Sequence, residues 1–215
     1  MIKVPFRIDE NVDVVVAAYK EDLSWLSKIR HPVFLYEKHP YEQEFLHYVT
    51  REKLENIGRE SHTYLHHIIK YYDDLAPITV FAQGDPIFHC GQFCEIANCS
   101  SIKEMDLLSK AADNRSNPES NDNFCGIGHM CKEGYDSDWA YQWIMPYAII
   151  GLEVMYSRRM PPRELQFYYG ALMAISREAI LKFRLDQYKE LFDLHYKYWS
   201  FPWAMERIWE TIYAT

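Results

Sequence analysis

The residue with the clearest chemical potential is Asp85, in the segment FAQGDP at residues 81–86. The apolar run before it predicts a buried strand, so the carboxylate lies at the carboxyl end of that strand, in a turn made rigid by Pro86. A hard divalent cation such as Mn²⁺ or Mg²⁺ takes oxygen ligands and bridges an acid to a diphosphate. Asp85 is therefore a candidate metal ligand. The alternative interpretation is an ordinary Asp-Pro turn.

A second candidate is Arg59, in the segment NIGR at residues 56–59. It opens a predicted helix, where the free amides and the helix dipole favour an anion. A cation in this first turn is unfavourable for the helix itself, which indicates that a negative group lies nearby. His62 and His66 follow at helical spacing and share a face with Arg59. They are candidates for the same site, although helical histidines are more often core or surface residues.

Three acids are candidates for a catalytic base, namely Asp136, Asp138 and Glu164, the last of which precedes the predicted closing strand. Asp136 and Asp138 lie in the segment GYDSDW at residues 134–139. A carboxylate there can take the proton from an acceptor hydroxyl, and Trp139 or Trp143 can stack on a sugar. In the alternative interpretation, Asp138 caps the amino end of a helix over residues 139–150.

The chain holds five cysteines, with His89 and His129 among them. Only Cys90 and Cys94 have a spacing close to that of a zinc knuckle. The odd count and uneven spacing favour free thiols in a reducing compartment. A zinc site remains the less favoured alternative.

The overall composition restricts the class of partner. The chain has 215 residues, 48% of them hydrophobic, and a formal net charge of −8. It is long enough for one substantial core. The acidic charge argues against a general nucleic-acid binder, which needs a basic surface. No apolar stretch is long enough to span a bilayer and no signal peptide is visible, so we expect a cytoplasmic protein without a membrane span.

Apolar runs alternate with helical patterns in the first part of the chain. Strands are predicted at residues 13–19, 33–38 and 78–82, with helices at 20–29 and 60–72. This order is typical of an α/β domain with a mainly parallel sheet. Because ligands bind beyond the carboxyl ends of such strands, those ends should form the site.

The remainder of the chain divides into two parts. Residues 87–135 read as a long irregular excursion with one helix at 102–112, either part of a cleft or a mobile insertion. The last third predicts a strand at 167–175, after which Ser176 caps a helix at 177–183. Further helices are predicted at 185–198 and 202–213, and the whole chain, 1–215, reads as a single domain.

Three landmarks occur in one order: the opening strand at residues 14–19, the NIGR helix start, and the strand ending in Gly84-Asp85. Together they resemble the nucleotide-binding half of GT-A-fold glycosyltransferases, most closely the small GT-A domain encoded by large chlorella viruses. The closing segment at 169–177 is similar to the acceptor-side element of these enzymes. Fungal and bacterial proteins share the segments around NIGRE and QGDP. The resemblance covers most of the chain and is weakest from 87 to 135.

The resemblance implies a nucleotide-binding half at 1–86 and an acceptor-side half at 87–215, the latter with C-terminal helices. It implies a UDP-sugar donor, a glycan acceptor and a Mn²⁺ or Mg²⁺ cofactor held by Asp85. One departure is that Gln83 replaces the first acid of the usual Asp-x-Asp pattern. A third ligand often comes from a C-terminal histidine, for which His195 is the candidate. The residues implied in donor binding are Ala17, Ala18, Tyr19, Glu37, Lys38, Arg59, His62 and Gly170.

We therefore expect a metal-dependent glycosyltransferase that moves a hexose or 6-deoxyhexose, of the glucose or rhamnose type, from UDP to a glycan. If the source is viral, the compartment would be the host cytoplasm. A nucleotidyltransferase or phosphatase is disfavoured because the sequence has neither a glycine-rich phosphate loop nor a cluster of acids for two metals. A non-catalytic carbohydrate-binding module with a degenerate metal site is the remaining alternative, because Gln83 replaces an acid.

Overall fold

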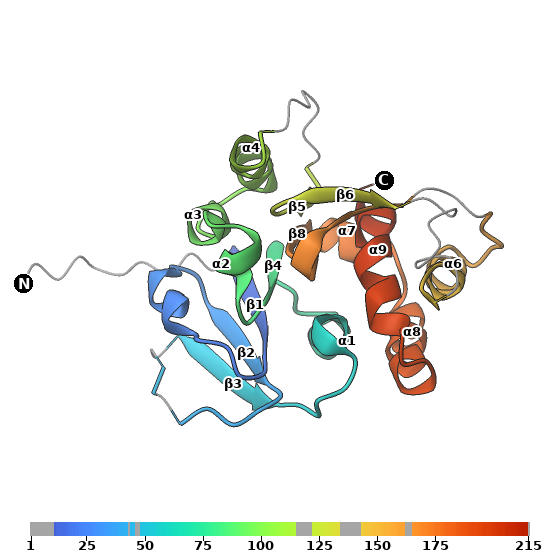
Figure 1. Cartoon of the computed structure of the whole chain (residues 1–215), viewed down its shortest axis with the longest axis horizontal. Coiled ribbons are helices and arrows are strands. Elements are labelled where there is room, and N and C mark those ends of the chain that lie inside the picture. Colours follow the sequence, from blue (N-terminus) through green and yellow to red (C-terminus); the bar gives the residue numbers. More distant parts are fainter. Residues whose placement is uncertain are drawn as a thin grey trace, which may run out of the picture.

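The computed structural model describes residues 11–42, 44–45, 48–114, 122–133, 143–161 and 165–214. Its centre is a six-stranded sheet with the order β3-β2-β1-β4-β8-β5 (Figure 1). The strands are β1 (Val12–Ala18), β2 (Val33–Glu37), β3 (Val49–Lys53), β4 (Ile78–Gln83), β5 (Phe124–Gly126) and β8 (Met173–Ser176). The first four run parallel, whereas β8 is antiparallel to both β4 and β5. The predicted α/β class with a mainly parallel sheet is confirmed.

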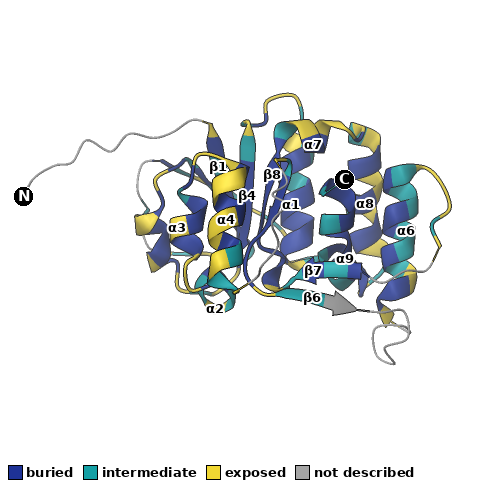
Figure 2. Cartoon of the chain, turned by 90° about the horizontal axis from the view of Figure 1, so that it is seen from above, coloured by how far each residue is buried: buried dark blue, intermediate teal, exposed yellow. Residues whose placement is uncertain are grey.

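Helices cover both faces of this sheet (Figure 2). The helices are α1 (Arg59–Lys70), α2 (Pro86–His89), α3 (Phe93–Ala97), α4 (Ile102–Ala112), α6 (Met145–Tyr156), α7 (Arg177–Leu181), α8 (Leu185–Lys197) and α9 (Phe201–Tyr213). One layer contains α1, α6, α8 and α9, and the other contains α3 and α4. A separate antiparallel pair joins β6 (Met130–Glu133) to β7 (Leu165–Tyr168). Within the described residues, no helix has the length and apolar character that a bilayer span requires.

The run of valines in β1 follows from its central position. Val14 and Val16 belong to the core under α3 and α4, whereas Val15 and Ala17 belong to the core under α1, α8 and α9. A parallel strand covered on both faces must be apolar at every position, because successive side chains point to opposite faces. Each face of the sheet thus has its own core.

The structure departs from the sequence prediction at three places before residue 135. β3 was not anticipated, because Thr50, Arg51 and Lys53 are exposed on an edge strand and break the apolar pattern. The helix expected at residues 20–29 is only a 3-10 turn, Ser24–Lys28. The excursion at 87–135 holds four regular elements besides α4, and one of them, β5, completes the main sheet.

The single strand expected at residues 167–175 is wrong. Its residues form β7, a 3-10 turn at Tyr169–Ala171 and then β8, and the two strands belong to different sheets. Gly170 has a φ of 77°, a left-handed conformation that glycine adopts without strain and that ends a strand. Ser176 caps α7 as predicted, because its side chain accepts the Ala179 N–H.

The remaining helix predictions hold with small shifts. α4 coincides with the predicted 102–112 helix, and α8 and α9 begin and end within one residue of expectation. α6 starts at Met145, while residues 139–142 of the helix expected there lie outside the described residues. All five cysteines are free thiols, and only Cys131 is not buried.

Candidate active-site cleft

The strand order reverses between β1 and β4: the chain proceeds from β1 to β2 and β3 on one side, then returns to place β4 on the other. In open α/β sheets, ligands bind beyond the carboxyl ends of the strands at this point. A cleft of about 230 Å³ lies there. Its lining residues are Ala17, Ala18, Tyr19, Glu21, Lys38, Asn56, Arg59, Glu60 and Gln83.

Five of the eight residues predicted to bind the donor line this cleft, namely Ala17, Ala18, Tyr19, Lys38 and Arg59. Glu37 lies outside the lining. Its side chain is buried in an ion pair with Arg51 of β3, so it is satisfied within the sheet. His62 and Gly170 also lie outside the lining, and each is considered below.

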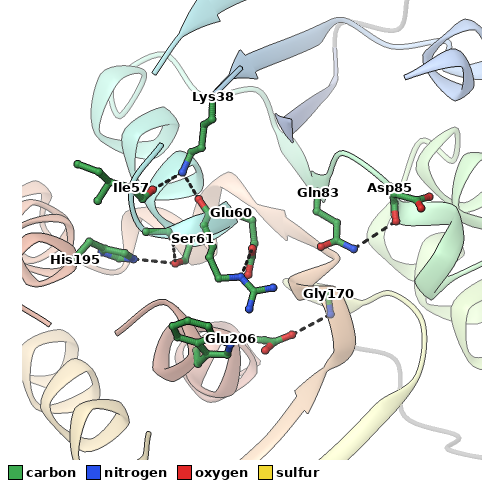
Figure 3. A network of polar contacts seen from close by, with 12 residues as sticks. Lys38, Ile57, Glu60, Ser61, Gln83, Asp85, Gly170, His195 and Glu206 are labelled. Atoms are coloured by element: carbon green, nitrogen blue, oxygen red, sulfur yellow. Dashed lines mark hydrogen bonds and ion pairs between the residues drawn. The ribbon is translucent and has the colours of Figure 1, made fainter. Parts of the chain in front are cut away.

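The first turn of α1 has an unusual backbone. Gly58 and Arg59 have φ values of 64° and 50°, both in the left-handed region. Glycine is required at position 58 for two reasons. The left-handed φ favours glycine, and a Cβ at this position would lie 2.5 Å from Cδ2 of His195. The Lys38 ammonium donates hydrogen bonds to the carbonyl oxygens of Ile57 and Arg59 (Figure 3). Lys38, which directly follows β2, thereby fixes the start of α1.

The Arg59 side chain is about half exposed, at 47%. Its Nε lies 3.4 Å from Oε2 of the buried Glu60, and its guanidinium carbon lies 5.1 Å from the ring centroid of Trp203. Burial raises the pKa of Glu60, and the neighbouring guanidinium opposes that rise. The cleft therefore presents an oriented and accessible guanidinium beside the helix start, which suits a phosphate or another anion.

The end of β4 carries the predicted metal ligand, and Asp85 is exposed. Its Oδ1 accepts a hydrogen bond from the Phe88 N–H at 3.3 Å and so caps α2, while the Gln83 side-chain amide donates to the Asp85 carbonyl oxygen at 3.4 Å (Figure 3). Among the described residues, no three His, Cys, Asp or Glu side chains group as a metal site. Asp85 is not among the residues that line the cleft. A single carboxylate contributes to a Mg²⁺-like site only together with substrate phosphates and waters.

His195 does not have a nitrogen to offer a metal. Its Nδ1–H donates to the Leu191 carbonyl oxygen at 3.0 Å, and the Ser61 hydroxyl lies 2.8 Å from Nε2 (Figure 3). Burial lowers its pKa to about 4, so the ring is neutral. The ring instead packs against Gly58 and supports the start of α1.

His62 is directed toward α8. Its ring stacks on Phe192 with 4.3 Å between ring centroids, and its Nε2 lies 3.2 Å from the Tyr196 hydroxyl oxygen. Burial lowers the pKa of His62 to about 3. His66 pairs with Glu52 of β3 at 3.2 Å. The shared helix face therefore joins α1 to its neighbours, and of its three residues only Arg59 lines the cleft.

Gly170 borders the cleft from the other half of the chain. A Cβ there would lie 3.2 Å from the side-chain nitrogen of Gln83 and 2.8 Å from the His89 ring. The Gly170 N–H donates to Oε1 of Glu206 at 2.9 Å (Figure 3). Glu206 in turn pairs with Arg207 at 2.6 Å. These contacts fix the β7–β8 turn against the end of β4.

Glu21 is a lining residue that the sequence interpretation missed. Its Oε2 accepts the N–H groups of Tyr19 and Lys20 at 2.7 and 3.0 Å. A Cβ on Gly84 would lie 2.3 Å from the same oxygen, so only glycine admits this carboxylate beside β4. Glu21 follows a predicted strand end as Asp85 does, and that signal could have identified it.

Exposed tryptophans extend from the cleft. The Trp203 ring lies under Arg59, Trp199 lies 5.6 Å from Trp203, and Trp143 lies 6.3 Å from Trp199 between ring centroids. Trp199 and Trp143 are 68% and 50% exposed. We call these three residues the tryptophan row. Of the sugar-stacking candidates named from the sequence, Trp143 belongs to this row, whereas Trp139 lies outside the described residues. The candidate bases Asp136, Asp138 and Glu164 also lie outside them.

Comparison with known proteins gives one match. No curated protein and no solved structure matches the chain significantly. Residues 14–215 match the family described as "Protein of unknown function (DUF3431)", and this match spans most of the chain, including every residue of the cleft. The chain is therefore a member of the DUF3431 family.

Proposed function

We propose that the protein is a GT-A-like glycosyltransferase that moves a hexose or 6-deoxyhexose from a UDP-sugar to a glycan acceptor. The observation that supports this most is the cleft at the β1–β4 reversal, where Arg59 and the start of α1 lie beside the end of β4. A nucleoside fits the small Ala17–Ala18 wall, and a diphosphate fits the guanidinium. The sequence landmarks that resemble this class of enzyme lie at these positions.

The proposed reaction forms a bond between an acceptor oxygen and C1 of the donor sugar. The bond from C1 to the β-phosphate oxygen breaks, UDP leaves, and the acceptor proton passes to a base. Negative charge grows on the leaving diphosphate, and Arg59 is placed to stabilise that charge. A divalent cation held by Asp85 would supply further charge at the same place. Asp136 and Asp138 remain the proposed bases.

The tryptophan row supports a saccharide on the acceptor side. Aromatic faces stack on sugars, and exposed indoles in contact with one another expose an apolar surface that usually marks a binding site. The row begins at Trp203, directly beneath Arg59. A glycan on these rings would therefore reach toward the proposed donor site. The same rings also favour the alternative of a glycan-binding module, which would bind glycan irrespective of nucleotide.

Our first prediction concerns Asp85 and is tested by thermal unfolding. UDP with Mn²⁺, at roughly a hundred times Kd, should stabilise the protein by about 2.7 kcal/mol, or roughly 5–10 °C in Tm. UDP alone should give a smaller shift. Asp85→Asn keeps an oxygen to cap α2 but removes the charge, and it should lose the Mn²⁺-dependent part.

The matched control is Asp74→Ala, an exposed acid after α1 that should respond like the unchanged protein. If UDP with Mn²⁺ leaves the Tm of the unchanged protein where it was, the proposed function is wrong. Hydrolysis of a panel of UDP-sugars with Mn²⁺ would then be expected to show no turnover. A preferred donor in that panel would identify the transferred sugar.

A further inference from the structure

The two cations that line the cleft are used differently. The Arg59 side chain is about half exposed, whereas the Lys38 ammonium donates hydrogen bonds to the carbonyl oxygens of Ile57 and Arg59 (Figure 3). Lys38 follows β2 directly, so its backbone is anchored in the sheet: its N–H donates to the Ala18 carbonyl oxygen at 2.8 Å. Lys38, anchored in the sheet by its backbone, thus holds the first turn of α1 in place through its ammonium group.

The hydrogen bonds from Lys38 hold a strained segment, the backbone at Gly58 and Arg59. Arg59 has a Cβ, and a left-handed conformation is unfavourable for such a residue. Charge-assisted hydrogen bonds to the carbonyls on both sides of Gly58 offset that cost. Without them, Arg59 would relax toward the right-handed region. Its side chain would then project from the backbone in a different direction, and the guanidinium would no longer lie over the Trp203 ring, 5.1 Å from the ring centroid.

The groups around Lys38 determine when it carries its charge. Burial lowers the pKa of Lys38 to about 8, and the nearby Glu60 carboxylate opposes this. His62 of α1 and His195 of α8 also face it, and with pKa values of about 3 and 4 both stay neutral in alkaline solution. Glu21 and Tyr19 face the same cleft from the end of β1.

We infer that Lys38 is a positioning residue whose ammonium holds Arg59 ready for a diphosphate, so that the affinity of the cleft for nucleoside diphosphates falls when this ammonium loses its proton. The inference rests on the proposed function. Its thermodynamic basis is linkage: a bound anion stabilises the charged lysine, so binding above about pH 8 takes up a proton and weakens as pH rises.

The test is calorimetric titration of UDP with Mg²⁺ between pH 7 and pH 9.5. The unchanged protein should lose roughly tenfold in affinity across this range, the order expected for a charge-assisted contact. Lys38→Met should bind roughly tenfold more weakly at pH 7 and show no such step. Lys38→Arg, whose guanidinium stays charged, should keep its affinity to pH 9.5. Lys20→Met, which changes an exposed lysine near the cleft, is the matched control and should show the same step as the unchanged protein.

Each outcome has a defined meaning. If Lys38→Met binds UDP as the unchanged protein does at pH 7, or keeps a pH step as large as that of Lys20→Met, the inference is overturned while the proposed function stands. If Lys38→Met fails to fold, the Lys38→Arg profile decides: a step at the same pH as in the unchanged protein overturns the inference. If the unchanged protein binds no UDP at any pH, it is the proposed function that fails.

Discussion

At the scale of single residues, buried histidines make the stability of the fold depend on pH. His67 of α1 is 1% exposed, and its Nδ1 lies 2.9 Å from the Tyr36 hydroxyl oxygen. Burial lowers its pKa to about 3, as it does for His62, and it lowers that of His195 to about 4. In an unfolded chain histidine titrates near 6.5. The unfolded state therefore binds more protons below this pH, and the free energy of unfolding should fall as pH decreases from about 6.5.

Two carboxyls act in the opposite direction. Burial raises the pKa of Asp13 to about 6, so the folded state binds more protons than the unfolded state between about pH 4 and pH 6. Burial also raises the pKa of Glu60. The contribution of these carboxyls to stability is lost as pH rises. Because three histidines oppose two carboxyls, we expect a net loss of stability on acidification.

The corresponding prediction uses His67→Asn. Removing one buried neutral histidine should flatten the dependence of unfolding free energy on pH by up to about 1.4 kcal/mol per pH unit between pH 4.5 and 6. Urea unfolding at several pH values measures this slope. Leu107→Ala, at an exposed site without a titratable group, is the control and should leave the slope unchanged. An equal slope in His67→Asn and the unchanged protein would contradict the assignment of His67 as buried and neutral.

At the scale of elements, the start of α1 carries the next prediction. Gly58→Ala should destabilise the fold by about 1–2 kcal/mol from the left-handed backbone alone. The clash with His195 and His62, at 2.5 and 2.6 Å from the added Cβ, should increase this. UDP affinity should fall with stability, because the displaced turn carries Arg59.

Gly91→Ala is the matched control for this change. Nothing lies within 4 Å of a Cβ added at Gly91, so its Tm should stay within a degree or so of the unchanged protein. Thermal unfolding and UDP titration of the two variants separate the effect of position from that of the substitution. A Gly58→Ala protein as stable as Gly91→Ala would show that the left-handed turn is not needed.

Regular elements with strong local patterns could be predicted from sequence. β1 and β4 are mostly apolar and rich in β-branched residues, and α4 has both an apolar stripe and a capping serine, Ser101. β3 could not be found, because edge strands are half solvated and its residues alternate charge instead of apolar character. The break between β7 and β8 could not be predicted for another reason. The residues on both sides of Gly170 favour strands, and only the strand pairing shows that β7 and β8 belong to different sheets.

The site could be predicted only where it depends on strand ends. Asp85, Lys38 and Tyr19 follow strands directly, so topology alone brings them to one edge of the sheet. Their partners could not be predicted, because contacts such as Arg59 with Trp203 or Gly170 with Glu206 join residues far apart in the chain. Spacing also placed His62 with Arg59, whereas packing of α8 against α1 draws that ring away.

At the scale of the whole molecule, donor and acceptor functions should be separable. Trp199 is 68% exposed and lies in the connection between α8 and α9. Trp199→Ala should leave the Tm and UDP affinity almost unchanged, because its ring packs little. Transfer to a glycan acceptor should fall several-fold or more, while hydrolysis of the donor continues, since each stacked ring is worth on the order of 1 kcal/mol.

The control for this prediction is Leu107→Ala in α4, which is 69% exposed in the opposite helical layer. It should alter neither transfer nor hydrolysis. The measurement compares released UDP with glycosylated product in one reaction. Equal losses of both in Trp199→Ala would place Trp199 in donor binding and contradict an acceptor role for the tryptophan row.

The position of β8 has a consequence for synthesis. β4 lies inside the sheet, yet the neighbour on one of its sides, β8, leaves the ribosome only after the whole segment from Pro86 to Leu172. Until then the nascent chain carries an open strand edge and an α1 surface that α8 and α9 have not yet covered. Exposed edges of this kind pair with other chains. We therefore expect the first half of the protein to be prone to association with other chains until β8, α8 and α9 have been synthesised and have packed against it.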